Sequence, residues 1–96
     1  MALRRDGDRL LLDGALGIET VPGVLRDASI ACREGVRVVD LGGVSDVDSA
    51  ALALALELIR EAGAEGRKLA FANLPDAMEK LARLYAVSDL IPGEPL

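Results

Sequence analysis

The 96-residue sequence contains no histidine, and this absence limits the chemistry that the chain can perform. Histidine is the usual general base beside a serine or cysteine nucleophile, and it is the commonest protein ligand of transition metals. The glycine-rich patterns GxGxxG and GxxxxGK[ST], which bind phosphates, are also missing. We therefore expect no enzymatic activity, no metal site and no cofactor.

Aromatic residues, cysteine and long apolar runs are scarce as well. Phe71 and Tyr85 are the two aromatic residues, which is too few for a platform that stacks nucleic-acid bases. The net charge of -5 also opposes binding to the phosphate backbone of nucleic acids. The single cysteine, Cys32, excludes an internal disulfide and fits a reducing cytoplasm. No apolar run reaches the roughly 18 residues that span a bilayer, so we expect a cytoplasmic protein without direct membrane insertion.

Strand and helix patterns alternate along the chain, and the length fits one domain, residues 1–96. An Asp-Gly turn near the N-terminus predicts a hairpin, after which short apolar runs alternate with segments of helical period. This order indicates an α/β fold, a mixed β-sheet with helices packed mainly on one face. Gly42-Gly43 is interpreted as a turn, and 91–96 as a frayed tail. The expected elements, in the order β-β-α-β-α-β-α, cover about 2–5, 9–13, 20–35, 36–41, 49–63, 68–72 and 75–87.

The segment 49–63 alternates leucine and alanine like a strand, but its length and composition favour a helix. On a helical wheel Leu52, Leu56 and Ile59 share one face, which we expect to pack on the sheet. Ala55 lies beside this face, and Leu54 and Leu58 lie on its flank. The predicted core residues of the other helices are Val21, Val24, Leu25, Ala28 and Cys32 in the first, and Met78, Leu81, Ala82 and Tyr85 in the last.

The opposite face of the 49–63 helix begins with small residues and ends with charged ones. Ala50 and Ala53 would let another element approach closely, either a loop of the same chain or a second protein. Ser49 lies where a loop meets this helix, and either Asp48 or Ser49 can cap it. If Asp48 is the cap, a phosphate on the free Ser49 hydroxyl would meet the positive end of the helix dipole. The candidate partner contacts are Asp46, Asp48, Ser49, Ala50, Ala53, Leu54 and Glu57, and Ser49 is the candidate switch.

The segment Asp48-Ser49-Ala50-Ala51-Leu52 resembles the motif Asp-Ser/Thr-(Ser/Ala)-Gly-Leu of the STAS domain family, the fold of bacterial anti-sigma factor antagonists. The similarity continues through "AGAEGRKL" and into the last helix. Within this family, "NLP" and "KLARLYAVSDLIP" are most similar to the MlaB branch, the small subunits of Mla-type phospholipid-transport ABC systems. Ala51 stands where the family usually has glycine. Because alanine is the better helix former by about 1 kcal/mol, the helix start should be firmer and less suited to a kinase.

The resemblance implies a regulatory or assembly role without catalysis. MlaB-like proteins dock on the MlaF-like ATPase subunit of a permease-containing ABC transporter that maintains outer-membrane lipid asymmetry. The resemblance therefore implies a position peripheral to the inner membrane, and it places Asp48 and Ser49 at the contact with the ATPase. The alternative is an anti-sigma factor antagonist, in which Ser49 would be phosphorylated by an anti-sigma factor kinase.

Overall fold

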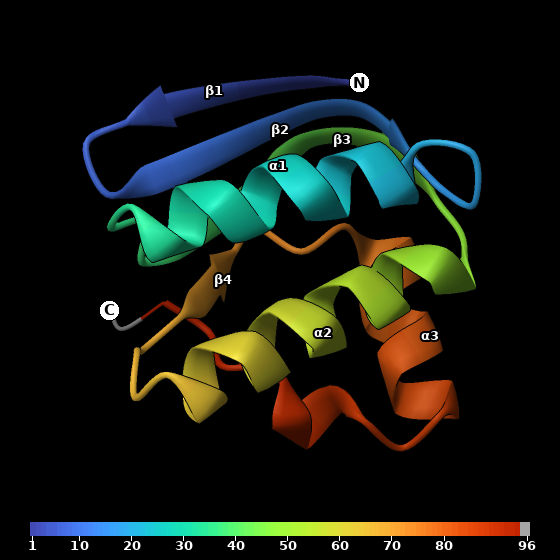
Figure 1. Ribbon diagram of the computed structural model, residues 1–96. Coiled ribbons are helices and arrows are strands. Elements are labelled where there is room, and N and C mark those ends of the chain that lie inside the picture. The colour runs from blue at the N-terminus through green and yellow to red at the C-terminus, as the bar shows by residue number, and fades with distance from the viewer. Residues whose placement is uncertain (95–96) are drawn as a thin grey trace.

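The computed structural model describes residues 1–94, which form a four-stranded sheet with helices against one face (Figure 1). The elements are β1 (Ala2–Asp6), β2 (Arg9–Leu16), α1 (Val21–Arg33), β3 (Val38–Val47), α2 (Ser49–Ala64), β4 (Ala70–Ala72), α3 (Asp76–Leu84) and the 3-10 turn η1 (Ser88–Leu90). Strands follow the order β1-β2-β3-β4, with β1 antiparallel to β2 and the other pairs parallel. The predicted α/β fold and element order are confirmed.

The core lies between the sheet and the helices α1 and α2, which run side by side across it (Figure 1). Alternate residues of the central strands face the helices, so Leu10 and Leu12 of β2 and Val39 and Leu41 of β3 are almost completely buried. Among residues 1–94, no helix is long and apolar enough to span a bilayer. The predicted core residues found buried are Val24, Ala28, Cys32, Leu52, Ala55, Met78 and Ala82, and Val21, Leu25, Ile59 and Leu81 are partly buried against them.

Helix α2 is rotated relative to the prediction. Leu54 and Leu58, which were expected on a flank, lie in the core, whereas Leu56 is partly exposed and lies outside the core cluster. The prediction that Leu56 packs on the sheet is therefore wrong. Leucines at every second position cover a wide arc of the helix, so the hydrophobic pattern alone fits several rotations.

The interpretation of Gly42-Gly43 as a turn is also wrong, because both residues lie inside β3, which continues to Val47. Their role is to allow close packing. A side chain at position 43 would overlap the carboxylate of Asp13 on the neighbouring strand. The pairing of β2 with β3 is irregular here, with register shifts on both sides of Asp13 and Gly14. The long β3 carries the chain to the start of α2.

The C-terminal part also differs from the prediction. Helix α3 ends at Leu84, so Tyr85 follows it and is exposed, although it was expected to face the core. The segment expected to fray pairs instead with β4: Phe71 N donates to Pro92 O at 2.8 Å, and Glu94 N donates to Phe71 O at 3.1 Å. Residues 95–96 lie outside the described residues.

Candidate docking surface

The loop between β2 and α1 is organised by the Thr20 side chain. Its hydroxyl accepts a hydrogen bond from Gly17 N at 3.0 Å and donates one to Ala15 O at 3.0 Å. Thr20 is the N-cap residue of α1, but its side chain makes no capping bond to the helix. The hydroxyl fixes the loop instead, and Ile18 is left on the surface with 76% of its area exposed.

Asp48 joins this loop to the N-terminus of α2. Its Oδ1 accepts a hydrogen bond from Ala50 N at 2.8 Å, which makes Asp48 the N-cap, and its Oδ2 accepts one from Ile18 N at 3.0 Å. Gly17 makes the second contact possible, because a Cβ atom there would lie 2.8 Å from Asp48 Oδ2. One carboxylate therefore satisfies free N–H groups in two segments and ties them together.

Since Asp48 is the cap, Ser49 occupies the first position of α2 and is exposed. No side-chain hydrogen bond within residues 1–94 involves its hydroxyl. One turn later Ala53 is also exposed, and Ala50 is partly exposed. We call the region at the start of α2 the α2-tip surface; it consists of Ile18, Asp46, Asp48, Ser49, Ala50 and Ala53.

Two of the candidate contact residues do not belong to this surface. Leu54 is 3% exposed and packs in the core, so the prediction that it contacts a partner is wrong for the folded domain. Leu54 is buried because α2 is rotated relative to the prediction, as described above. Glu57 is partly buried and accepts two hydrogen bonds from Arg60, including one from Nε to Oε2 at 2.9 Å. These bonds lower the pKa of Glu57 and engage its charge within the helix.

Ile18 was missed by the sequence reasoning. The available signal was an isoleucine between Gly17 and Glu19, in a stretch that links a strand to a helix and should be on the surface. An isoleucine exposed on a loop is unexceptional by itself. It becomes informative only when Asp48 is seen to hold the loop beside Ser49.

The α2-tip surface presents both apolar and charged groups to the solvent. Its exposed side chains include the apolar ones of Ile18 and Ala53 and the carboxylates of Asp46 and Asp48, and no ion pair within residues 1–94 involves either carboxylate. The single thiol is elsewhere: Cys32 is buried in α1, and this burial raises the pKa of its thiol, which disfavours the nucleophilic thiolate.

Comparison with known families identifies the domain. A family model described as "Mlab, STAS domain" matches residues 1–92. The chain belongs to the MlaB-type STAS domain family. It is 33% identical over 89 residues to the intermembrane phospholipid transport system binding protein MlaB of Escherichia coli (strain K12), and the match covers 90% of this chain and 89% of that protein. The MlaB protein of Shigella flexneri gives the same values. The resemblance inferred from the Asp48–Leu52 motif is confirmed.

Solved structures show the same STAS fold. A putative anti-sigma factor antagonist from Thermotoga maritima superposes with a TM-score of 0.76 at 15% identity, covering 99% of this chain and 86% of that one. The phosphorylated form of the Bacillus cell fate determinant SpoIIAA gives a TM-score of 0.67 at 19% identity, with 98% and 90% covered. At these identities the likeness concerns the fold.

Proposed function

We propose that this protein is a noncatalytic subunit of an Mla-type phospholipid-transport ABC system and that it docks on the ATPase subunit through the α2-tip surface. Membership of the MlaB-type family supports the link to phospholipid transport. The observation that carries the docking proposal is the exposure of Ile18, Ser49 and Ala53 around the shared cap, Asp48. Docking would hold the domain at the cytoplasmic side of the inner membrane, where it would support the assembly or activity of the ATPase and so outer-membrane lipid asymmetry.

The geometry suits protein binding for three physical reasons. The two hydrogen bonds of Asp48 hold the loop and the helix in one arrangement before a partner arrives, which reduces the ordering cost of association. The small side chains of Ala50 and Ala53 allow a partner's backbone to come close. The carboxylates of Asp46 and Asp48 favour a partner surface that carries arginine or lysine.

Affinity purification of the tagged protein from its native cell tests the proposal. The expected result is recovery of an ABC ATPase together with a permease. Ala53→Arg places a long cation on the α2-tip surface and should reduce recovery of the ATPase at least tenfold, on the order of a disrupted interface residue. Ala64→Arg is the matched control, since Ala64 is an exposed alanine at the other end of the same helix. Equal recovery with both variants would place the contact elsewhere.

A second candidate function, anti-sigma factor antagonism, is favoured by one observation. The Ser49 hydroxyl is exposed at the first position of α2, where a phosphate would meet the positive end of the helix dipole. This function requires an anti-sigma factor kinase as partner. Purification would then recover that kinase in place of transporter subunits, mass spectrometry would find phosphate on Ser49, and Ser49→Asp would abolish kinase binding. Ser49 unmodified under all growth conditions would contradict it.

A further inference from the structure

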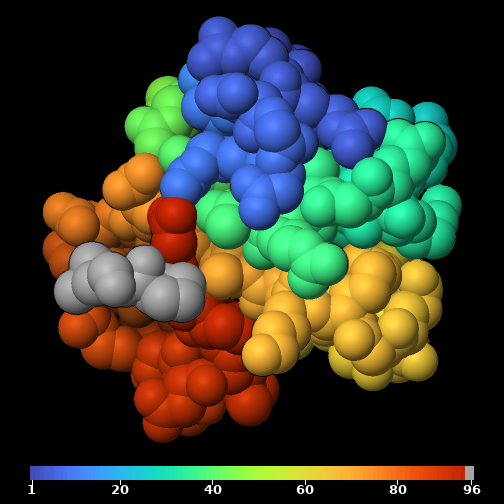
Figure 2. Space-filling view, turned by 90° about the vertical axis from the view of Figure 1, so that its left-hand side faces the viewer, coloured from blue at the N-terminus to red at the C-terminus, as the bar shows by residue number. Residues whose placement is uncertain are grey.

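The segment after η1 lies across the outer edge of β4, away from the α2-tip surface. We call residues 91–94 the strap. It is held to β4 by the two backbone hydrogen bonds on either side of Phe71, and Ile91 is partly buried against the core. In Figure 2 this segment, in red, lies on the surface between the blue N-terminal hairpin and the orange β4–α3 region.

The strap separates two hollows in the surface. One, of about 370 Å³, lies between α3, η1 and the end of β4, and Phe71 forms part of its wall. The other, of about 490 Å³, lies between the end of α2 and the start of β4, and its wall is mostly apolar. Pro92 and Gly93 line both hollows. If the strap moved away, they would form a single groove along β4.

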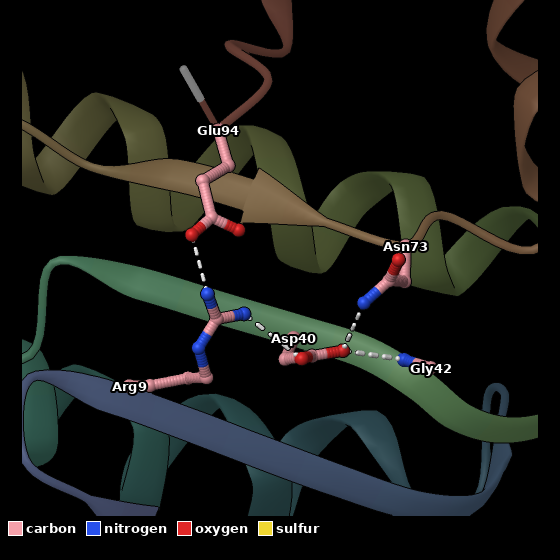
Figure 3. Close-up of polar contacts among 5 residues, drawn as sticks. All are labelled: Arg9, Asp40, Gly42, Asn73 and Glu94. Carbon is pink, nitrogen blue, oxygen red and sulfur yellow. Dashed lines mark hydrogen bonds and ion pairs between the residues drawn. The ribbon is translucent and has the colours of Figure 1, made fainter. Parts of the chain in front are cut away.

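An ion pair fixes the far end of the strap. Glu94 pairs with Arg9 of β2, and Arg9 also donates to Asp40 Oδ2 at 2.9 Å (Figure 3). Asp40 is itself held by Gly42 N at 2.8 Å and by the Asn73 side chain at 3.1 Å. Arg9 is thus positioned by groups of the sheet that do not depend on the strap. Glu94 is the one carboxylate of this cluster that the strap contributes.

We propose that the strap opens and closes as a local unit, and that the ion pair between Glu94 and Arg9 is its latch. Within residues 1–94, few contacts hold the strap: two backbone hydrogen bonds join it to β4, a third joins Ile91 N to Ser88 O, one ion pair joins it to β2, and Ile91 is partly buried. Segments with so few contacts open far more often than the whole domain unfolds. The latch is also accessible to water, because the side chains of Arg9 and Glu94 are 29% and 37% exposed. Opening uncovers the N–H and C=O groups of Phe71 and joins the two hollows.

Amide hydrogen exchange followed by NMR tests this proposal in the full chain. In Glu94→Gln the amides of Phe71 and Glu94, which bond across the strap, should exchange about three- to fivefold faster than in the wild type, the effect of losing one half-exposed ion pair. The matched control is Glu34→Gln, which removes another exposed pair, Arg5–Glu34 at 2.7 Å, between β1 and the C-cap of α1. It should leave the exchange of the Phe71 amide unchanged.

A second variant separates the latch from general destabilisation. Arg9→Gln should accelerate the same two amides, and it also removes the bond from Arg9 to Asp40. The double variant with Glu94→Gln should exchange no faster than Arg9→Gln alone, because both substitutions remove the same Arg9–Glu94 pair. In the wild type and in every variant the core amide of Val39 should exchange more slowly than that of Phe71, and its rate should depend more steeply on added urea, because unfolding of the domain exposes more surface than opening of the strap. Unchanged exchange at Phe71 in Glu94→Gln would overturn the proposal. Equal protection and equal urea dependence of the Phe71 and Val39 amides would also overturn it, because the strap would then open only with the whole domain.

Discussion

Two aspartates, Asp40 within β3 and Asp48 directly after it, hold neighbouring segments in different ways. Asp40, in the first half of the strand, binds the side chains of Arg9 and Asn73 and the backbone of Gly42. Asp48, which follows the last residue of the strand, binds two backbone N–H groups and has no cationic partner within residues 1–94. Both carboxylates organise the chain around them.

The difference lies in what happens to the charge. The negative charge of Asp40 is compensated inside the domain, and its side chain is mostly covered. The negative charge of Asp48 remains at the surface, opposite the positive end of the α2 dipole. The first site stabilises the fold, whereas the second does so while still presenting a charged surface to the solvent.

The rotation of α2 about its axis decides which of its residues are exposed beside Asp48. The largest expected change in stability tests this rotation. Leu58→Ala truncates a buried core residue and should lower the free energy of unfolding by about 2–5 kcal/mol. Leu56→Ala should cost about 1 kcal/mol or less, because this side chain lies outside the core cluster. Urea denaturation measures both. The reverse order would mean that α2 presents a different face to the solvent.

The next effect concerns the cap. Asp48→Ala removes the hydrogen bonds to Ala50 N and Ile18 N and should lower the free energy of unfolding by about 1–2 kcal/mol. Asp46→Ala is the control, because Asp46 is also exposed, near the same helix, and makes no side-chain hydrogen bond within residues 1–94; its cost should stay within about 0.5 kcal/mol. Equal urea midpoints for the two variants would show that Asp48 does not stabilise the tip.

Alanine-to-glycine substitutions after α3 and in the α2 tip should have smaller effects on stability, and these effects should be opposite in sign. Ala86 follows α3 on the strap side and has a φ of 58°, a left-handed conformation in which a Cβ atom is unfavourable. Ala86→Gly should therefore raise the free energy of unfolding by about 1 kcal/mol. Ala53→Gly, in the regular helix of the tip, should lower it by about the same amount. Changes of the same sign in thermal unfolding would contradict this difference.

The smallest effect is a dependence on pH. Burial raises the pKa of Asp40, but hydrogen bonds from Asn73, Gly42 N and Arg9 outweigh it and leave the pKa below its ordinary value of 3.8. The ionised form therefore adds stability above pH 3.8 that is lost as the pH falls through the lower pKa of the folded state. Urea titrations below about pH 4 should show a shallower loss of stability in Asp40→Asn than in the wild type. With Asp46→Asn as the control, parallel curves for the wild type and Asp40→Asn would contradict this contribution.

The sequence determined the element order because each element carries its own local pattern. The Asp-Gly turn, the helical period around Met78 and the β-branched run before Asp40 are short-range signals, and all three predicted the correct type of element. The rotation of α2 could not be predicted, because leucines at 52, 54, 56 and 58 leave the choice of buried side to the packing of α1 and the sheet. In the same way, nothing local indicates that Gly43 faces Asp13 on another strand.

The candidate docking surface was predicted in part. The motif starting at Asp48 identified the α2 tip, and the expectation that Ser49 is free if Asp48 caps the helix agrees with the structure. Ile18 could not be found from the sequence, because its position depends on a hydrogen bond to a residue 30 positions away. The pair between Arg9 and Glu94 spans 85 positions and is equally invisible to a local pattern.

Gly17 has a consequence for genetics. It has no side chain, yet a methyl group at this position would push the Asp48 carboxylate out of place and release both the loop and the cap. If the α2-tip surface is the docking site, as proposed, a screen for variants that no longer bind the partner should recover Gly17 substitutions together with changes at Ser49 and Ala53. A Gly17 substitution would act indirectly, by changing the arrangement of Asp48 and the loop. Gly17 should therefore not be counted among the residues that contact the partner.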